Sequence, residues 1–494
     1  MASRNPEKPN IVFILTDDQG YWALGCYGNS EIRTPNLDTL ATAGTRFENF
    51  FCTSPVCSPA RASLLTGRIP SQNGVHDWIR MGNMGKDAIE YLEGQIGYSD
   101  ILARNGYTCG ISGKWHLGNS EVPQKSFSHW YVHQRGASPF YNAPMIRDGK
   151  AVNDPGYITD LITDDAINFI EEQSERNNPF YISVHYTAPH SPWIDNHPKD
   201  IVESYDDCAF DSCPQEPKHP WSPPRLGYIG APDKWEDMDV RENLKCYYAS
   251  VTAMDTNIGR IIKRIDEMGL RESTLFCFLS DNGFNCGHHG IWGKGNGTLP
   301  INMYDTSVKV PAIMSQPGRI IQNSVCEDLV SGYDFMPTLL DYLDIDNPVG
   351  PGLPGKSFAP ALYGKPSVKN EGIVVFDEYG PVRMIRTKEW KYVHRYQFGP
   401  HELYDLKNDP QERYNLVEYS HNSSVVRELR AQLEEWFCRY VDPAVDGVRE
   451  PVTGKGQISR VGLKGKGEPA FHRHFTVNMP TVVSVWEPNN RGGE

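Results

Sequence analysis

Four segments of the sequence consist of an apolar run that ends in residues able to do chemistry. The segments cover residues 10–20, 106–118, 180–190 and 274–283, and their polar ends contain Asp17 and Asp18, Lys114 and His116, His190, and Asp281 and Asn282. A fifth group, Cys57 and Arg61, lies in "SPVCSPARASLLTGRIP". Acids, cations and one thiol are therefore available to a single site if these segments converge.

The acidic residues fit a site for a hard metal ion. Asp17, Asp18, Asp281 and Asn282 would supply three carboxylates and one amide oxygen. This all-oxygen set suits calcium or magnesium, whereas zinc prefers histidine or thiolate ligands. Each pair alone could simply cap a helix. Three carboxylates gathered without a cation would repel one another, so a metal explains them better than a solvated surface does.

The cationic residues fit a pocket for an oxyanion. Arg61, Lys114, His116, His190 and Lys294 each follow an apolar or turn segment. Singly, such residues are usually solvated loop side chains. Gathered beside a metal, they would hold a tetrahedral oxyanion and stabilise charge that develops on a leaving oxygen.

Cys57 stands at the predicted start of a helix. Pro59 fits the first turn, where a missing N–H costs nothing, and the helix through "ARASLLTG" would point its positive end at the thiol and at any anion beside it. The alternative is a structural cysteine that caps the helix, with Arg61 one turn further on by coincidence.

The order and spacing of these motifs resemble the formylglycine-dependent sulfatases of the alkaline-phosphatase-like superfamily. "CSPAR" followed by "ASLLTGR" is similar to the first family signature, and "GYTCGISGKWH" to the second, with Cys109 where serine or threonine is more usual. "LTDDQG", "SDNGFNCGHHGIWGKG", "YDTSVKVPAI" and "ELYDLKNDPQERYNL" also match. The resemblance covers residues 10–416.

The resemblance implies a cofactor and a modified nucleophile. A formylglycine-generating enzyme would oxidise Cys57 to formylglycine, an aldehyde that hydrates to a geminal diol. One hydroxyl of the diol would attack sulfur, and the sulfated intermediate would then expel sulfate without a second attack by water. The implied calcium ligands, with magnesium as the alternative ion, are Asp17, Asp18, Cys57 in its modified form, Asp281 and Asn282.

The resemblance also assigns roles to the cationic residues. Arg61 would brace the diol, and Lys114 and Lys294 would contact sulfate oxygens. His190 would protonate the departing alcohol, and His116 would take the proton of the second hydroxyl when sulfate leaves.

Residues that bind the rest of the substrate are harder to identify from sequence. His76, Asp77 and Arg80 follow the nucleophile helix closely, and His289 matches a position that is histidine in many relatives, so we expect these four near the pocket. The long insertion at residues 187–235 carries aromatic residues that could stack on a sugar ring or simply pack the loop, namely Trp193, Trp221, Tyr228 and Trp235.

The elements that must position these residues alternate between strands and helices. Helical periodicity over residues 158–172 and 242–268 separates the apolar runs, which predicts an α/β fold with a mostly parallel sheet sandwiched by helices. In such sheets ligands bind outside the carboxyl ends of the strands, where the four polar clusters fall.

The pattern of apolar residues changes in the C-terminal quarter of the chain. Short strand-like pieces after about residue 370 and an amphipathic helix over residues 424–440 predict a small antiparallel sheet with one packed helix. We therefore divide the chain into a catalytic domain (1–370), a small subdomain (371–441) and a tail (442–494). The tail is either a flexible end, which we favour, or an arm over the active site or a neighbouring subunit.

Composition excludes several classes of partner. With 48 basic and 62 acidic residues the net charge is −14, which argues against nucleic acid or an anionic membrane as the main partner. The apolar run "IVFIL" is too short for a signal peptide or a membrane span, so we expect a cytoplasmic protein of bacterial origin. A homo-oligomer is compatible with the sequence.

The leading hypothesis is a calcium-dependent sulfuric ester hydrolase that acts on a small sulfated sugar. The alternatives are a broad arylsulfatase and a phosphonate or phosphodiester hydrolase of the same superfamily. Those hydrolases tend to carry histidine where this chain has Asn282, which favours sulfate esters. A member with unmodified Cys57 would only bind sulfated glycans.

Overall fold

The computed structural model describes residues 8–176, 178–224, 226–367, 370–377, 381–396, 399–465 and 467–472. Ten strands form one large sheet: β1 (Asn10–Thr16), β2 (Thr45–Phe51), β3 (Thr108–Gly113), β4 (His129–His133), β5 (Pro144–Arg147), β6 (Lys150–Asn153), β7 (Phe180–His185), β8 (Thr274–Ser280), β11 (Ala312–Ser315) and β12 (Ser324–Ser331). Their order is β12-β2-β11-β8-β1-β7-β3-β4-β5-β6, and a separate short hairpin joins β9 (Asn285–Cys286) to β10 (Trp292–Gly293).

The centre of the large sheet is parallel. β8, β1, β7 and β3 are consecutive and mutually parallel, and Ile14 of β1 lies between Val184 of β7 and Phe278 of β8. β1, β7 and β8 are buried along their whole length. Parallel strands buried on both faces need helices on both sides of the sheet, and the sheet becomes antiparallel only toward its edges.

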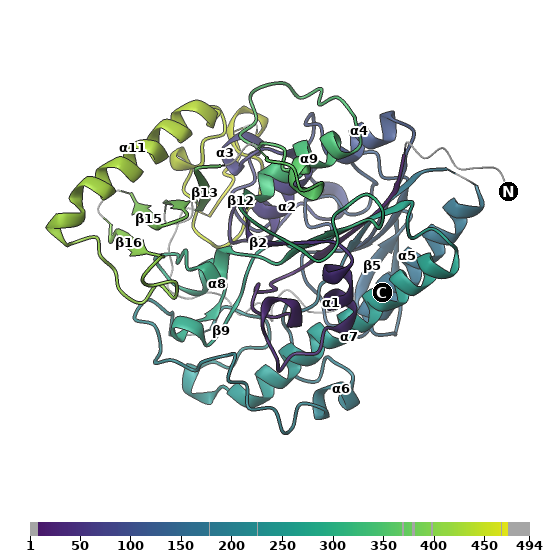
Figure 1. Ribbon diagram of the computed structural model, residues 1–494, viewed down its shortest axis with the longest axis horizontal. Coiled ribbons are helices and arrows are strands. Elements are labelled where there is room, and N and C mark those ends of the chain that lie inside the picture. The colour runs from purple at the N-terminus through teal and green to yellow at the C-terminus, as the bar shows by residue number, and fades with distance from the viewer. Residues whose placement is uncertain are drawn as a thin grey trace, which may run out of the picture.

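Helices cover the sheet on both faces (Figure 1). The helices are α1 (Pro35–Thr42), α2 (Cys57–Thr66), α3 (Pro70–Asn73), α4 (Tyr98–Arg104), α5 (Ile158–Glu175), α6 (Lys199–Glu203), α7 (Val240–Glu267), α8 (Asp305–Val308), α9 (Phe335–Tyr342), α10 (Ala359–Leu362) and α11 (Ser423–Tyr440). α2, α4 and α9 share one apolar core with the sheet, and α1, α5 and α7 share the core on its other face. The predicted helices 158–172 and 242–268 correspond to α5 and α7.

A second sheet follows in the C-terminal part of the chain. β13 (Gly372–Asp377), β14 (Val382–Thr387), β15 (Trp390–Arg395) and β16 (Glu402–Asp405) pair in this order, each antiparallel to the next. α11 packs on this sheet through Leu429, Leu433 and Phe437, and Figure 1 shows the two together at one end of the molecule. The large mixed sheet and the small antiparallel sheet confirm the predicted fold class.

The segment after α11 packs against the catalytic domain. Val452, Val461, Ala470 and Phe471 are buried in the same apolar core as α2, and the yellow end of the ribbon lies beside α3 in Figure 1. The prediction of a flexible end is therefore wrong for residues 442–465 and 467–472, because apolar side chains of this segment are buried in that core. Residues 473–494 of the predicted tail lie outside the described residues.

The helices of the described residues include none that combines the length and the apolar character required to cross a membrane.

Candidate active site

The four predicted polar clusters meet at one edge of the sheet. β1, β3, β7 and β8 are neighbours and run in the same direction, so their carboxyl ends lie side by side. The amide of Asp17 donates to the carbonyl of Ala188 (3.2 Å), and the amide of Asp281 donates to that of Thr16 (3.1 Å). These bonds fix the turns after the strands, and Asp18 adopts a left-handed conformation (φ 63°) in the first of them.

Three carboxylates gather there with the donor chemistry of a hard cation. Oxygens of Asp17, Asp18 and Asp281 lie within 4.8 Å of one another, and all three residues are buried. Asn282 donates through Nδ2 to Asp18 (2.7 Å), while its buried Oδ1 accepts no hydrogen bond from the described residues. An unpartnered amide oxygen beside three carboxylates fits calcium or magnesium.

Two buried lysines balance the charge of these carboxylates. Lys114 is paired with Asp17, and the Nζ of Lys294 lies 2.5 Å from Asp18 Oδ1 and 2.8 Å from Cys57 Sγ. Burial alone would raise the pKa of Asp17, but nearby cations, Lys114 foremost, hold it well below the usual value. The pKa of Asp281 is raised to about 7 because it is buried and faces the charge of Asp17.

Cys57 is the first residue of α2, so the positive end of the helix faces its side chain. Its Sγ donates to Asp17 Oδ1 (3.3 Å). Burial and the negative charge of Asp17 raise the pKa of the thiol to about 12. An unmodified Cys57 therefore presents a protonated thiol, which is a weak nucleophile.

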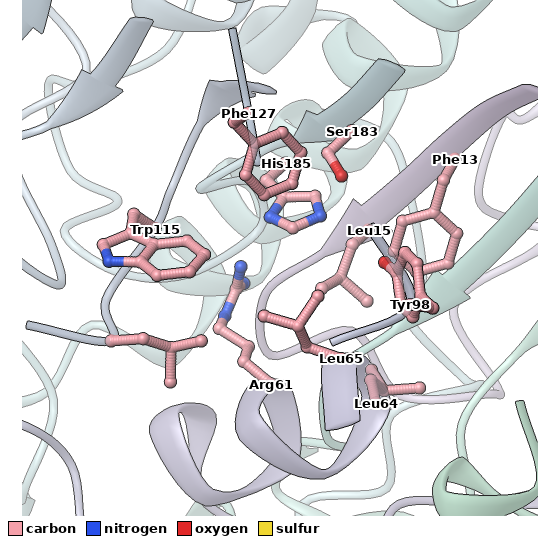
Figure 2. Close-up of a pocket in the computed structure, with 11 residues that line it drawn as sticks. Phe13, Leu15, Arg61, Leu64, Leu65, Tyr98, Trp115, Phe127, Ser183 and His185 are labelled. Carbon is pink, nitrogen blue, oxygen red and sulfur yellow. The ribbon is translucent and has the colours of Figure 1, made fainter. Parts of the chain in front are cut away.

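Arg61 lies one helical turn after Cys57 and connects Asp281, after β8, with Lys114, after β3. Its Nε donates to Asp281 Oδ2 (2.9 Å) and its Nη1 to the carbonyl of Lys114 (3.1 Å). Figure 2 shows the side chain rising from α2 toward His185 in a largely apolar pocket. The guanidinium is buried and held by these two hydrogen bonds.

His116 is held in one orientation. Its Nε2 lies 3.1 Å from the carbonyl oxygen of Ile79, which can only accept, so the ring proton is on Nε2. Nδ1 is buried and has no hydrogen-bond partner among the described residues. Burial, with the charges of Lys114 and Arg61, holds the pKa of His116 well below its usual value. The imidazole is therefore neutral, with a free lone pair on Nδ1.

His190 follows β7 and lies next to the acids. Its Nδ1 is 2.5 Å from the carbonyl oxygen of Ser191, and its Nε2 is 3.6 Å from Asp18 Oδ2. Burial lowers the pKa of His190, and Asp17 and Asp18 oppose this shift. The side chain keeps 14% of its surface exposed, more than that of Lys114 or Lys294, so His190 is accessible to a bound substrate.

The other predicted site residues make their hydrogen bonds to other parts of the chain. His76 and Asp77 are buried, and they bond to Val445 and Gly456 of the C-terminal segment. Arg80 is half-buried and donates to the carbonyl of Lys455 (3.3 Å).

His289 also lies against another part of the chain. Its ring stacks on that of Tyr304 with centroids 3.8 Å apart, and its amide donates to Glu216 (3.1 Å). The polar bonds described for His76, Asp77 and His289 thus hold the chain together, and their place near the pocket stays a prediction.

The insertion at residues 187–235 uses its aromatic residues in two ways. Trp193 and Tyr228 are buried, with ring centroids 4.8 Å apart, in an apolar cluster that also contains Trp292. Packing is therefore the role of these two side chains. Trp221 and Trp235 are half-buried and lie beside the cations Arg395 and Lys218.

Sequence reasoning missed two supporting residues. Ser58 Oγ donates to the carbonyl of His116 (2.9 Å) and accepts from the amide of Ile79 (3.1 Å), and so links α2 to both residues. Gly136 lies so close to His116 that a Cβ there would be 2.1 Å from Nε2. Ser58 adjoins Cys57 and could have been suspected, whereas nothing in the sequence connects Gly136 with His116.

Comparison with known proteins identifies the family. The sulfatase family model matches residues 9–345, and a model described as the C-terminal part of N-sulphoglucosamine sulphohydrolase matches residues 287–438. The chain belongs to the sulfatase family and is a sulfuric ester hydrolase.

Relatives with a stated activity match over nearly the whole chain. An N-acetylglucosamine-6-O-sulfatase of Bacteroides thetaiotaomicron is 28% identical over 92% of this chain and 91% of its own. A ulvan-active sulfatase of Formosa agariphila is 30% identical over 99% and 89%. A solved structure of a protein in complex with its substrate D-glucosamine-2-N,6-O-disulfate superposes with a TM-score of 0.77 at 26% identity, over 90% of this chain and 100% of that one.

Proposed function

We propose that this protein hydrolyses sulfate esters of mono- or oligosaccharides of the glycosaminoglycan type, with a formylglycine formed from Cys57 and a bound calcium ion. The observation that carries the proposal is the meeting of Cys57, three buried carboxylates and two buried lysines at one edge of the sheet. The activities named for the sulfatases of Bacteroides thetaiotaomicron and Formosa agariphila support a carbohydrate substrate.

The proposed metal ligands are Asp17, Asp18, Asp281, Asn282 and the modified residue 57. The free Oδ1 of Asn282 supports this set, because a buried amide oxygen is costly unless it has a partner. Bound calcium would polarise the sulfate oxygens and draw charge away from sulfur. The protein's part is to hold these oxygens on rigid strand ends.

The proposed nucleophile is a hydroxyl of hydrated formylglycine at position 57. The unmodified Cys57 thiol is protonated and is therefore a weak nucleophile. Arg61 would brace residue 57 through its place on α2. Lys114 and Lys294 would exchange part of their contact with Asp17 and Asp18 for sulfate oxygens, where they stabilise developing charge.

Two histidines would move the protons. The accessible His190, in its imidazolium form with Nδ1–H on the Ser191 carbonyl, would give its Nε2 proton to the departing alcohol oxygen. His116 would accept a proton at Nδ1 from residue 57. The free lone pair of Nδ1 supports the second role. Proton transfer by a positioned side chain typically contributes about 10² to 10⁴-fold to a rate.

The test combines a modification assay with a substrate panel. Protein co-expressed with a formylglycine-generating enzyme is digested, and the peptide containing Cys57 is weighed by mass spectrometry. Sulfate release is then measured from 6-O-, 4-O-, 2-O- and N-sulfated hexosamines, an aryl sulfate and a phosphonate monoester. Cys57→Ala should abolish release, and Cys438→Ala, which changes an exposed thiol, should not.

The outcomes separate the proposal from its alternatives. Selective release from one sulfated sugar supports it and names the bond. Release from the aryl ester alone would make the protein an arylsulfatase, and turnover of the phosphonate alone would contradict sulfate-ester chemistry. An unmodified Cys57 in active protein would exclude formylglycine.

A further inference from the structure

The segment at residues 78–80 is a short extended stretch whose two edges bind different parts of the molecule. On one edge the carbonyl of Trp78 accepts from the amide of Gln457 (2.8 Å), and the amide of Arg80 donates to the carbonyl of Gln457 (2.9 Å). Ile79 and Gln457 thereby form a parallel β-bridge. The C-terminal arm, which we define as residues 442–465 and 467–472, thus pairs with the chain next to the active site.

The opposite edge of the same stretch binds the active site. The amide of Ile79 donates to Ser58 Oγ (3.1 Å), and its carbonyl accepts from His116 Nε2 (3.1 Å). Successive peptide groups of an extended chain point to opposite sides. The arm therefore holds the peptide groups on either side of Ile79, while Ile79 itself holds His116.

The side chain of Gln457 makes two further hydrogen bonds to the same segment. Its Oε1 accepts from the amide of His76 (3.0 Å), and its Nε2 donates to the carbonyl of Gly74 (2.9 Å). Gln457 is completely buried. One residue of the arm therefore makes four hydrogen bonds to residues 74–80, each shielded from water, where such bonds are expensive to break.

The arm lies so close to Arg80 at residue 456 that only glycine fits there. Gly456 has φ 89°, and a Cβ there would lie 2.7 Å from the Cβ of Arg80. Its amide donates to Asp77 Oδ2 (3.0 Å). The arm is anchored further along by the buried Val461 and Phe471.

We propose that the C-terminal arm is a positioning element for His116, with Gln457 as its central residue. This inference rests on the proposed function, in which His116 accepts a proton at Nδ1. The Ile79 carbonyl sets both the tautomer and the direction of the ring, and Gln457 fixes that carbonyl from the opposite edge. His76 and Asp77 also bond to the arm, at Val445 and Gly456, which accounts for their burial.

The first experiment compares two variants of the arm in the full-length, formylglycine-containing enzyme. Gln457→Ala removes the side-chain hydrogen bonds and keeps the backbone bridge, and we expect kcat to fall about tenfold or more with KM unchanged, because a misplacement of about 1 Å can cost about 100-fold. Val448→Ala changes an exposed arm residue and should leave kcat unchanged. Rates are normalised to the formylglycine content measured by mass spectrometry.

A double-mutant cycle separates positioning from general structural damage. If Gln457 acts through His116, Gln457→Ala lowers kcat in the wild type but has little further effect in a His116→Ala background. Equal losses in both backgrounds would overturn the proposal, as would an unchanged kcat in Gln457→Ala. Gly456→Ala, which drives the arm away by steric overlap, serves as the second variant and should behave in the same way.

A measurement without turnover keeps this inference distinct from the proposed function. The ring-nitrogen NMR signals of His116, assigned with His116→Ala, should report the Nε2–H tautomer in the wild type and a mixture of tautomers in Gln457→Ala. If the wild type has no sulfatase activity and Gln457→Ala still changes the tautomer signals, the proposed function is refuted and the positioning of His116 by the arm is supported. Unchanged signals in an active enzyme would refute the positioning alone.

Discussion

At the residue scale, the chemistry of the site depends on which atom of each side chain is already engaged. His116 illustrates this, because Ile79 occupies Nε2 and the pKa of the ring is lowered by burial, Lys114 and Arg61. A buried neutral imidazole with one nitrogen bound to a carbonyl can only accept a proton at the other. The Ile79 carbonyl, which lies outside the motifs that resemble the sulfatase signatures, therefore leaves Nδ1 as the atom at which this ring can accept a proton.

Gly136→Ala tests how closely the His116 ring must be held. The added Cβ would lie 2.1 Å from Nε2, so the imidazole has to move or tilt. We expect kcat to fall about 100-fold, in line with a displacement of about 1 Å, and the melting temperature to change little. Gly227→Ala, where nothing lies within 4 Å of the new Cβ, is the matched control. Wild-type kinetics in Gly136→Ala would show that the ring has more freedom than the contacts imply.

Removal of the metal is the second residue-scale prediction. If the proposed calcium is bound, dialysis against a chelator should abolish sulfate release and lower the melting temperature, because the ion would offset the charge of Asp17, Asp18 and Asp281. A ligand that binds only the folded state at about 100 times its Kd stabilises it by about 2.7 kcal/mol. Calcium titrated back should restore both readouts. Full activity in the metal-free protein would contradict the assigned ligands.

At the scale of elements, the four apolar runs were sufficient to predict the geometry of the acidic and cationic cluster. Each run became a central parallel strand, and β8, β1, β7 and β3 proved to be neighbours. The reason is physical: parallel strands are buried on both faces, so they appear as continuous apolar runs, and their carboxyl ends share one edge. The meeting of residues adjacent to those ends, such as Asp17 and Lys114, could therefore be predicted from sequence.

The contacts between distant segments could not be predicted in this way. The arm has weak periodicity, and its pairing with residues 74–80 rests on one β-bridge at Gln457 and on isolated hydrogen bonds of Val445, Gly456 and Gln457. Such a pairing leaves no local pattern because both partners are irregular. His76 and Asp77 were predicted near the pocket from their distance along the chain from Cys57, and this distance could not show that they bond to the arm.

His76→Gln tests whether His76, which contacts Val445 of the arm, makes the stability of the protein depend on pH. Burial lowers the pKa of His76 to about 4, from 6.5 in a model peptide. Between these values the unfolded chain binds a proton that the folded protein does not, so stability is full above pH 6.5 and is lost as the pH falls toward about 4. The shift corresponds to about 3 kcal/mol.

Glutamine keeps a donor for the Val445 carbonyl but does not titrate in this range. The free energy of unfolding of His76→Gln, measured by chemical denaturation at pH 7 and pH 4.5, should therefore fall less between the two values than that of the wild type. His421→Gln removes an exposed histidine and should behave as the wild type does. An identical pH dependence in His76→Gln and the wild type would mean that His76 is not the buried titrating group.

At the scale of the whole molecule, the small sheet is joined to the catalytic domain by a buried group of charges. Lys391 of β15 is completely buried, and its Nζ pairs with Asp305 at the start of α8 and with Glu412 after β16. It also donates to the carbonyl of Met303 (2.9 Å). The neighbouring Asn302 donates to the carbonyl of Lys294 (3.1 Å). The small sheet therefore supports the loop that carries one of the proposed sulfate-binding lysines.

Lys391→Met tests whether this connection stabilises the molecule as one unit. Methionine fills a similar volume but leaves the carboxylates of Asp305 and Glu412 buried without their main cation. Removing one partner of a buried ion pair typically costs about 3–5 kcal/mol, so the free energy of unfolding should fall by about this amount in a denaturant titration. Lys388→Met, at an exposed position of the same hairpin, should change it by less than about 0.5 kcal/mol.

The same variant also distinguishes a local role from a long-range one. If the small sheet supports Lys294 through residues 302–305, the Lys391→Met protein that remains folded should bind substrate more weakly, with KM raised at a temperature well below its melting point. A loss of stability with unchanged KM would confine Lys391 to holding the two sheets together. Unchanged stability would show instead that water reaches Asp305 and Glu412 and replaces the ammonium group, in spite of their burial around Lys391.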